Sequence, residues 1–179
     1  MHNKISNTFT FISTFNKEKI LNLNKDVGII FRNYNQKLDK GMLIKLRNFC
    51  KKNQRKVYLS NNMKLAINNG FDGAYIPSFN KSLGLKKYSL KKDFLIMGSA
   101  HNKFEIYTKY KQGVDMIFIS PLFKTKSYTS ALGVIKFNLL TRFTNKKIIA
   151  LGGISERNIK KLKITNASGF SGISYFLND

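Results

Sequence analysis

The sequence predicts an α/β protein whose parallel sheet closes into a (β/α)₈ TIM barrel, in a single domain that spans residues 1–179. Two observations favour this fold: short apolar runs alternate with helix-like segments along the chain, and there are eight such runs. Parallel neighbours need crossover connections, so the alternation indicates a parallel sheet. Eight units favour a closed barrel over an open sheet. At 179 residues the barrel would be trimmed relative to the usual size of this fold.

The apolar runs share short length and enrichment in Ile, Val, Leu and Phe, and we expect strands at 9–15, 27–31, 57–59, 74–76, 94–97, 116–119, 148–151 and 169–176. Helices are expected between them at 18–23, 43–49, 63–67, 103–111 and 134–140. The sequence stops three residues after Phe176, so we expect the barrel to lack a full C-terminal helix. A second copy of the chain could cover the apolar surface left there, which would make a homo-oligomer.

The net charge of +23 is extreme for a chain of this length. The lysines are scattered rather than gathered in one tail, which is typical of a solvated surface, so nucleic acid is an unlikely ligand. An anionic small substrate would still be attracted. Cys50 is the only cysteine, and no apolar run is long enough to span a bilayer. We expect a cytoplasmic protein that has no membrane partner and keeps Cys50 packed as a thiol.

Two strand-end segments point to phosphate binding. IFISPLFKT (117–125) and KIIALGGIS (147–155) each read as a buried strand followed by a polar turn, and the second turn begins with Gly152 and Gly153. Glycine lets backbone N–H groups approach an anion closely. A phosphate site at the carboxyl ends of neighbouring strands is therefore predicted.

The serial order of these motifs resembles the thiamine phosphate synthase/TenI superfamily. The matching segments are SNNMKLAINNGFDGAYI (60–76), GSAHNKFEIYTKYKQGVDMIFISPLFKT (98–125), ALGGISERNI (150–159) and SGFSGIS (168–174). The resemblance implies a transferase of thiamine biosynthesis that joins hydroxymethylpyrimidine diphosphate to a thiazole phosphate and releases diphosphate. Its partners would be these phosphorylated precursors.

The resemblance also implies a set of site residues. Arg32 would contact the diphosphate through its fork of donors, and Ser99 would face the pyrimidine; these two are the catalytic candidates. The expected ligands of the thiazole phosphate are Thr125, Ser127, Gly152, Gly153, Ile173 and Ser174.

Other family positions are changed in this chain. The two aspartates that the family uses to bind Mg²⁺ fall on Asn61 and Asn80, and neutral amides are poor ligands for this cation. No metal ligand is therefore assigned, and Mg²⁺ would arrive mainly with the diphosphate. Two motif lysines fall on Tyr34 and Tyr128, and nearby lysines that could compensate are Lys81, Lys124 and Lys126. We expect Asn61 and Asn80 to face one cavity, across a site rimmed by Arg32 and Ser99.

Three alternatives stay open beside the synthase. A TenI-like tautomerase would need a histidine where the chain has Ser120-Pro121, and the other proton carrier, His101, is interpreted as a capping or solvent-contacting residue. A barrel that binds a thiamine precursor without turnover would tolerate the lost aspartates. An RNA-binding protein would need aromatic platforms, but Phe118 and Phe123 are expected to pack in the core.

Several polar residues and glycines are interpreted as structural. Asp72 and Asp115 are expected in turns before strands, and Gly70 and Gly113 at helix ends. Ser155 is predicted to cap a helix whose positive end Glu156 would favour.

Overall fold

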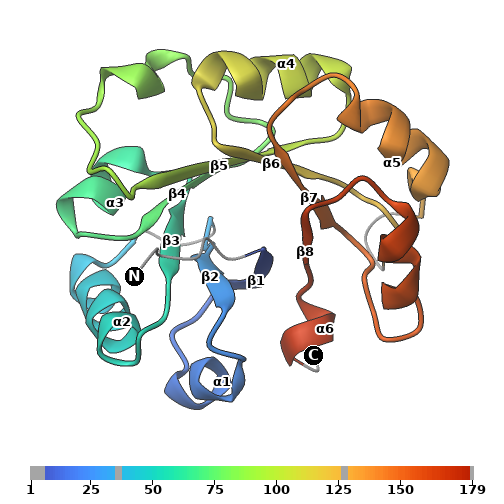
Figure 1. Cartoon of the computed structure of the whole chain (residues 1–179). Coiled ribbons are helices and arrows are strands. Elements are labelled where there is room, and N and C mark those ends of the chain that lie inside the picture. Colours follow the sequence, from blue (N-terminus) through green and yellow to red (C-terminus); the bar gives the residue numbers. More distant parts are fainter. Residues whose placement is uncertain (1–6, 35–37, 126–128, 178–179) are drawn as a thin grey trace.

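The computed structural model describes residues 7–34, 38–125 and 129–177. Eight parallel strands form a closed barrel in the order β1 to β8, with β1 beside β8 (Figure 1). The strands are β1 (Thr8–Ile12), β2 (Val27–Phe31), β3 (Val57–Ser60), β4 (Gly73–Ile76), β5 (Leu95–Ala100), β6 (Met116–Ile119), β7 (Lys147–Leu151) and β8 (Gly169–Ser171). The (β/α)₈ barrel predicted from the sequence is confirmed.

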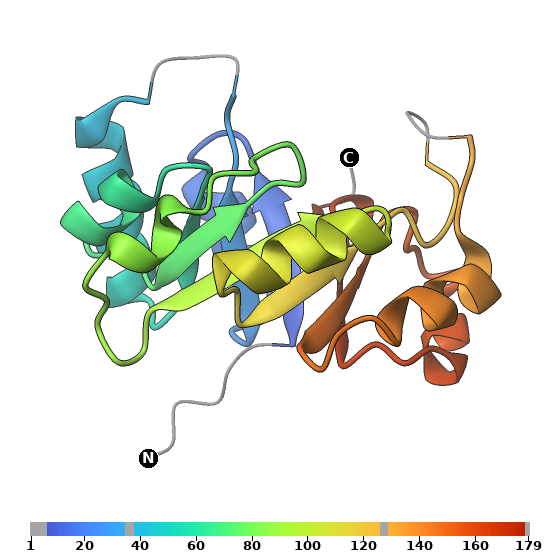
Figure 2. The same cartoon turned by 90° about the horizontal axis from the view of Figure 1, so that it is seen from above.

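Helices lie outside the strands, and Figure 2 shows α4 running along β5 and β6. The helices are α1 (Lys17–Asn22), α2 (Lys40–Lys52), α3 (Met63–Asn68), α4 (Lys103–Gln112), α5 (Gly133–Thr141) and α6 (Ser174–Leu177). Short 3₁₀ helices, η1 (Gly84–Lys87) and η2 (Ile159–Ile164), stand in the connections after β4 and β7. These abbreviated connections explain how a barrel fits into so short a chain.

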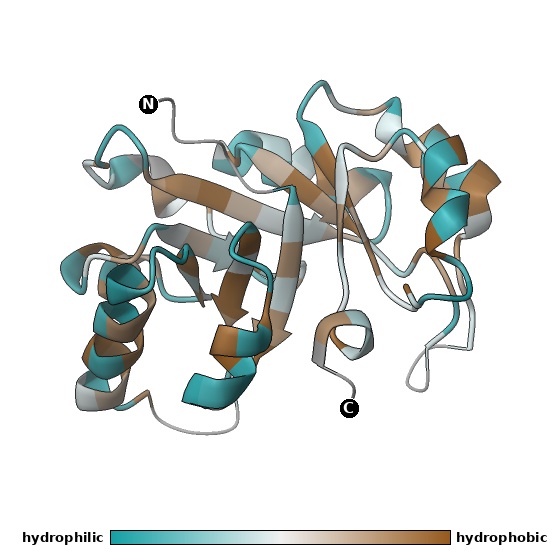
Figure 3. Cartoon of the chain, turned by 60° about the horizontal axis from the view of Figure 1, so that its bottom comes forward, coloured by the Kyte–Doolittle hydropathy of each residue, from teal (hydrophilic) through white to brown (hydrophobic). Residues whose placement is uncertain are grey.

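Alternating side chains divide the apolar residues into two layers. The layer inside the barrel is rich in aromatic rings, among them Phe9, Tyr58 and Phe118, all buried. The ring centroids of Phe9 and Phe118 lie 5.2 Å apart. The second, larger layer fills the space between the sheet and the helices. Figure 3 shows that the strands are predominantly hydrophobic, whereas the helices carry both hydrophobic and hydrophilic residues.

The same alternation positions the polar residues at the mouth of the barrel. Ile30, Tyr58 and Met97 belong to the inner layer. Successive side chains of a strand point to opposite faces, so the residues two positions later share the inward direction. These residues are Arg32, Ser60 and Ser99, at the carboxyl ends of β2, β3 and β5. The fold therefore brings two of the expected site residues to one end of the barrel.

The first and last strands, β1 and β8, are shorter than the sequence predicts. β1 ends at Ile12 rather than at Phe15, and β8 ends at Ser171 rather than at Phe176. The residues after β8 form the single turn of α6, and no longer C-terminal helix is present among the described residues. Phe176 stacks on Phe170 with ring centroids 5.5 Å apart, and this contact folds the segment back against the barrel.

The predicted cap at Ser155 is also wrong. The segment that follows β7 turns before η2 begins at Ile159, and Glu156 lies in that turn. Asn158 shapes the turn, because its side chain accepts a hydrogen bond from Ser155 N at 2.9 Å and donates one to Gly153 O at 2.8 Å. The side chain of Asn158, and not that of Ser155, therefore organises this turn.

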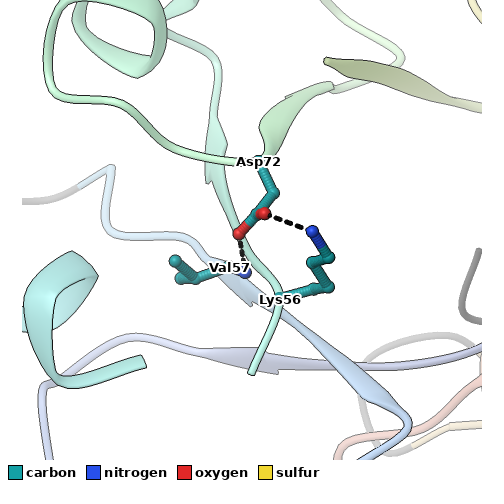
Figure 4. Close-up of polar contacts among 3 residues, drawn as sticks. All are labelled: Lys56, Val57 and Asp72. Carbon is teal, nitrogen blue, oxygen red and sulfur yellow. Dashed lines mark hydrogen bonds and ion pairs between the residues drawn. The ribbon is translucent and has the colours of Figure 1, made fainter. Parts of the chain in front are cut away.

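The other structural interpretations hold. Gly113 ends α4 with a left-handed φ of 76°, and Gly70 follows α3 with a φ of 67°. The Asp72 carboxylate accepts hydrogen bonds from Val57 N and Lys56 Nζ (Figure 4), and Asp115 accepts one from Ile96 N. Each aspartate therefore ties two neighbouring strand starts together.

Cys50 is fully buried on α2, as predicted, and burial raises the pKa of its thiol to about 12. Among the described residues, no helix is long and apolar enough to cross a membrane.

Candidate active site

Arg32 lies at the carboxyl end of β2 and faces a cavity of about 180 Å³. Its backbone N–H donates to Ile12 O at 2.8 Å, which fixes the strand end beside β1. Its guanidinium carbon lies 4.6 Å from the centroid of the Phe11 ring, a cation–π contact that orients the side chain. Ile173 lines the same cavity from the loop after β8. Arg32, expected to contact the diphosphate, and Ile173, expected to contact the thiazole phosphate, therefore line the same cavity.

The loops after β2, β3 and β4 are joined by side chains. The Tyr34 hydroxyl lies 2.6 Å from Ser60 Oγ, and the Tyr34 ring contacts Phe79 with centroids 5.5 Å apart. Asn80 Nδ2 donates to Asn61 Oδ1 at 2.7 Å. Asn61 has a left-handed φ of 58°, which asparagine tolerates better than most residues. The two asparagines therefore lie together, at the end of the barrel where Arg32 also lies.

The asparagine pair does not fit a magnesium site held by the protein. The Asn61 side-chain oxygen is engaged by Asn80, and Asn80 Oδ1 accepts from Ser82 N at 3.0 Å. Among the described residues there is also no group of three His, Cys, Asp or Glu side chains that could hold a metal ion. Mg²⁺ is usually bound through one or two carboxylates, whereas this pair supplies two neutral amide oxygens, each of which already accepts a hydrogen bond.

Lys109 on α4 fixes the loop after β4, a role that the sequence reading missed. Its side chain is fully buried, and its Nζ donates to Pro77 O at 2.8 Å, to Asn80 O at 2.9 Å and to Gln112 Oε1 at 2.9 Å. Gln112 adds hydrogen bonds from Nε2 to Asn80 O and Ser82 O, both at 2.9 Å. Burial lowers the pKa of the Lys109 ammonium to about 8. The backbone that carries Asn80 is thus held from outside the barrel.

The sequence signal for Lys109 is limited to its helical spacing from Ile106, three positions earlier on the same face of α4. A lysine at helical spacing within a buried face is expected to find acceptors for its charge.

His101 links the loops after β4, β5 and β6. Its Nδ1 lies 2.8 Å from Ser120 O and its Nε2 lies 3.1 Å from Ser78 Oγ. A carbonyl only accepts, so Nδ1 carries a proton and donates it to Ser120 O. The helix cap is Asn102, whose side chain accepts from Glu105 N, so the expected capping role of His101 is wrong, although its side chain is only half-buried. Both ring nitrogens are engaged.

Ser99 lies deeper than Arg32 in the barrel, with 5% of its surface exposed. The side chain of Tyr75, on the neighbouring strand β4, lies close to it. Burial raises the pKa of the Tyr75 hydroxyl above its ordinary value, so the pair is neutral. Ser99 therefore forms part of the polar floor beneath the mouth.

The loops after β6 and β7 are joined by their backbones. Leu122 N donates to Leu151 O at 2.8 Å, and Phe123 N donates to Gly152 O at 3.0 Å. Gly152 and Gly153 have φ values of 96° and 66°, which favour glycine. A Cβ at Gly153 would overlap the backbone carbonyls of the β6 loop, which shows how closely the two loops approach.

The remaining predicted residues lie around this double loop or outside the described part of the chain. Lys124 is exposed and Thr125 is half-buried at the end of the β6 loop, whereas Lys126 and Ser127 lie outside the described residues, as does Tyr128. Lys81 is exposed after β4. Leu151 of β7 pairs with Ser171 of β8, so the Gly152–Gly153 turn is adjacent to the β8 loop. Ile173 follows in that loop, and the exposed Ser174 is the first residue of α6.

Phe118 and Phe123 are not available as stacking platforms. Phe118 is fully buried inside the barrel, and Phe123 is partly buried against the outer core. The aromatic surface that an RNA-binding reading would need is therefore not supplied by these two residues.

The chain resembles known proteins in both sequence and fold. The sequence model described as thiamine monophosphate synthase (TMP-TENI) matches residues 25–176. A thiamine-phosphate synthase from Prochlorococcus marinus subsp. pastoris is 29% identical over 157 residues, which cover 85% of this chain and 45% of that protein. The thiamine-phosphate synthase of Pelagibacter ubique is 26% identical over 98% of this chain and 91% of its own length.

Among solved structures, thiamine phosphate pyrophosphorylase from Pyrococcus furiosus superposes with a TM-score of 0.74 and 16% identity, covering 96% of this chain and 87% of that one. The citrate synthase SbnG superposes nearly as well, with a TM-score of 0.69 and 11% identity over 93% of this chain and 85% of that one. Shape similarity at these identities shows the fold alone. The match over residues 25–176 is more specific, and by it the chain belongs to the thiamine monophosphate synthase family.

Proposed function

We propose that the chain is a divergent thiamine phosphate synthase, which joins hydroxymethylpyrimidine diphosphate to thiazole phosphate with release of diphosphate. The proposal rests on one observation: in a chain of this family, Arg32 and Ile173 line the same cavity at the carboxyl end of the barrel. Family membership supports phosphorylated thiamine precursors as the substrates.

The reaction requires neutralised charge and alignment more than acid–base chemistry. Loss of diphosphate from the pyrimidine methylene leaves a resonance-stabilised cation, and the thiazole nitrogen attacks that carbon. Arg32 would bind the departing diphosphate, because a guanidinium matches phosphate oxygens and stays charged. The glycine turn at 152–153 would hold the thiazole phosphate through backbone N–H groups. Aligning the two substrates in a fixed mouth supplies much of the remaining acceleration.

The proposed reaction requires the negative charge of the departing diphosphate to be stabilised. Asn61 and Asn80 offer no carboxylate, so any Mg²⁺ would be bound mainly by the diphosphate itself. Exposed Lys81 and Lys124, on the loops after β4 and β6, would add positive charge near that group.

A barrel that binds a thiamine precursor without turnover is the second candidate. The observation that favours it is the closed hydrogen bond between Asn61 and Asn80, which occupies the position of the family's metal ligands. A TenI-like tautomerase is less favoured, because β6 is followed by Ser120-Pro121 and both ring nitrogens of His101 are engaged.

Product formation from the two precursors by the purified chain, with and without Mg²⁺, tests the proposal. We expect thiamine phosphate to form, and Arg32→Ala to lower kcat/KM about a hundredfold, since a charged hydrogen bond is worth about 1.5–3 kcal/mol. Arg142→Ala, which removes an exposed arginine at the end of α5, is the matched control and should retain activity. Absence of product together with calorimetric binding of thiazole phosphate would replace the synthase by the binding-only barrel.

A further inference from the structure

A second cavity, of about 590 Å³, lies at the amino-terminal ends of the strands. Its lining residues include Lys56 before β3, Asp72 before β4 and Lys91 before β5, together with Arg47 and Lys51 from the last turns of α2. The candidate active site follows the carboxyl ends of β1, β2 and β8. In a parallel barrel these are opposite ends, so the two cavities are separate.

Positive charge dominates this amino-terminal cavity. Its lining holds five cationic side chains and one carboxylate, namely Arg47, Lys51, Arg55, Lys56, Lys91 and Asp72. The carboxylate is already engaged, by Lys56 Nζ at 2.8 Å and by Val57 N at 2.9 Å (Figure 4). Within the described residues, Lys56–Asp72 is the ion pair of this cavity. The other four cations therefore have no carboxylate partner among the lining residues.

Arg55 places a fixed charge in the wall of the cavity. Its side chain is only 5% exposed, and its terminal nitrogens donate to backbone oxygens of Leu21, Leu23 and Asn24. Carbonyl acceptors orient the guanidinium but do not neutralise it. Its Nε is buried and has no hydrogen-bond partner in the described part of the chain. Arg47 is oriented in the same way, since its Nε donates to Asn69 O at 2.8 Å.

The lining also defines the class of ligand. None of the lining side chains is aromatic or aliphatic, so the cavity offers no apolar surface for an acyl chain. Pockets of roughly 300–1,000 Å³ hold small molecules, and a single phosphate would leave this one largely empty. Several phosphates in a row would place one negative charge near each unpaired cation, where charge-assisted hydrogen bonds are strongest.

We propose that the amino-terminal cavity binds an oligophosphate group, either an inorganic polyphosphate or the phosphate chain of a nucleotide. The site is independent of the proposed synthase reaction. Its expected ligand contacts are the exposed Lys51 and Lys91, with the half-buried Arg47 and the buried Arg55 providing the fixed end of the site.

Titration of the ¹⁵N-labelled full chain with tripolyphosphate at 150 mM salt tests the site, because that salt screens the overall field of the protein. We expect saturable shifts of the Gln54 and Gly70 amides, both in the cavity lining. The Gly152 and Gly153 amides report separately on the opposite end. The double variant Lys51→Gln, Lys91→Gln should weaken binding at Gln54 and Gly70 at least about tenfold.

The control is Lys160→Gln, Lys163→Gln, which removes the same charge from exposed residues of η2 and should change the affinity less than about twofold. Equal weakening by both double variants, or shifts at Gln54 and Gly70 that do not saturate, would overturn the proposal. ATP in place of tripolyphosphate identifies the source: equal affinity indicates that the phosphate chain alone is bound, and tighter binding indicates a nucleotide. All four substituted lysines are exposed, so each variant is expected to fold, and its spectrum verifies this.

Discussion

The two halves of the barrel mouth are built in different ways. Between β2 and β4 the loops meet through side chains, as in the contacts Tyr34–Ser60 and Asn80–Asn61. Between β6 and β7 they meet through the backbone, where Phe123 N donates to Gly152 O and glycine occupies positive φ. One half therefore depends on which side chains are present, and the other on chain conformation and the absence of Cβ atoms.

This difference teaches which properties of a site can change without loss of the fold. Replacing a single side chain can remove a ligand from the side-chain half and leave the loop in place. A backbone anion site, as proposed at the Gly152–Gly153 turn, keeps its N–H groups for as long as the turn forms. The proposed phosphate site should therefore tolerate side-chain substitutions better than a site built from side chains.

The largest expected effect comes from placing a Cβ in the backbone half. Gly153→Ala would push a methyl group into the carbonyls of the β6 loop at a φ of 66°, so we expect a loss of about 2–4 kcal/mol in unfolding free energy and of thiazole phosphate binding. Gly133→Ala is the matched control, since its φ is 65° but no heavy atom lies within 4 Å of the new Cβ. Urea unfolding and calorimetry compare the two, and equal losses would contradict the steric argument.

Removing the external support of the β4 loop should have the next largest effect. Lys109→Met takes away the donor to Pro77 O and Asn80 O and leaves those oxygens without this partner, so we expect a loss of about 2–3 kcal/mol. Lys103→Met removes an exposed lysine from the same helix and should cost less than about 0.5 kcal/mol. Equal unfolding midpoints for the two variants would show that Lys109 does not hold the loop.

Restoring carboxylates should recreate metal dependence in the side-chain half. The double variant Asn61→Asp, Asn80→Asp brings two like charges together where an amide hydrogen bond now stands, so we expect a loss of about 1 kcal/mol without metal. Millimolar Mg²⁺ should recover it by binding both carboxylates. Thermal unfolding with and without Mg²⁺ measures this. If Mg²⁺ does not raise the unfolding temperature of the double variant, the side chains at positions 61 and 80 cannot bind one ion together.

The smallest predicted effect is a pH dependence that belongs to Lys109. Its folded pKa of about 8 lies below the ordinary value of 10.5, so between these two pH values the unfolded chain binds a proton that the folded chain has released. Stability contributed by this group therefore rises with pH in that window. Relative to Lys109→Met, the wild type should gain about 1 kcal/mol between pH 7.5 and 9. Urea unfolding of both proteins at the two pH values isolates the contribution of Lys109, because the contributions of all other titrating groups cancel when the two unfolding free energies are subtracted.

The barrel and the position of its mouth could be predicted because both are encoded locally. Each strand is a short apolar run, and Gly152 follows its strand directly in the sequence. The network around the β4 loop could not be predicted in the same way. Lys109 reaches Pro77 across 32 positions, and His101 reaches Ser120 across 19. Which acceptor a buried lysine finds is decided by the packing of α4 on the sheet, not by its neighbours in the chain.

The errors at 13–15 and 172–176 have a common physical origin. In each segment the sequence run continues past the point where the neighbouring strand stops offering hydrogen-bond partners. β1 and β8 pair only at Thr8↔Phe170 and Phe9↔Ser171, so the residues after Ser171 turn away into α6. Strand length is thus set by the partner strand as much as by the run itself.

The seam between β1 and β8 bears on how the molecule folds. The hydrogen bond from Thr10 Oγ1 to Gly172 O joins residues 162 positions apart, and the ladder beside it is short. Seven of the eight strand pairings can form between sequence neighbours, whereas this one closes a loop of nearly the whole chain and therefore carries the largest entropy cost for few contacts. Closure of the ring is expected to be the last folding event. Until it occurs, the edges of β1 and β8 are open to pairing with another chain, and refolding at high protein concentration should favour aggregation.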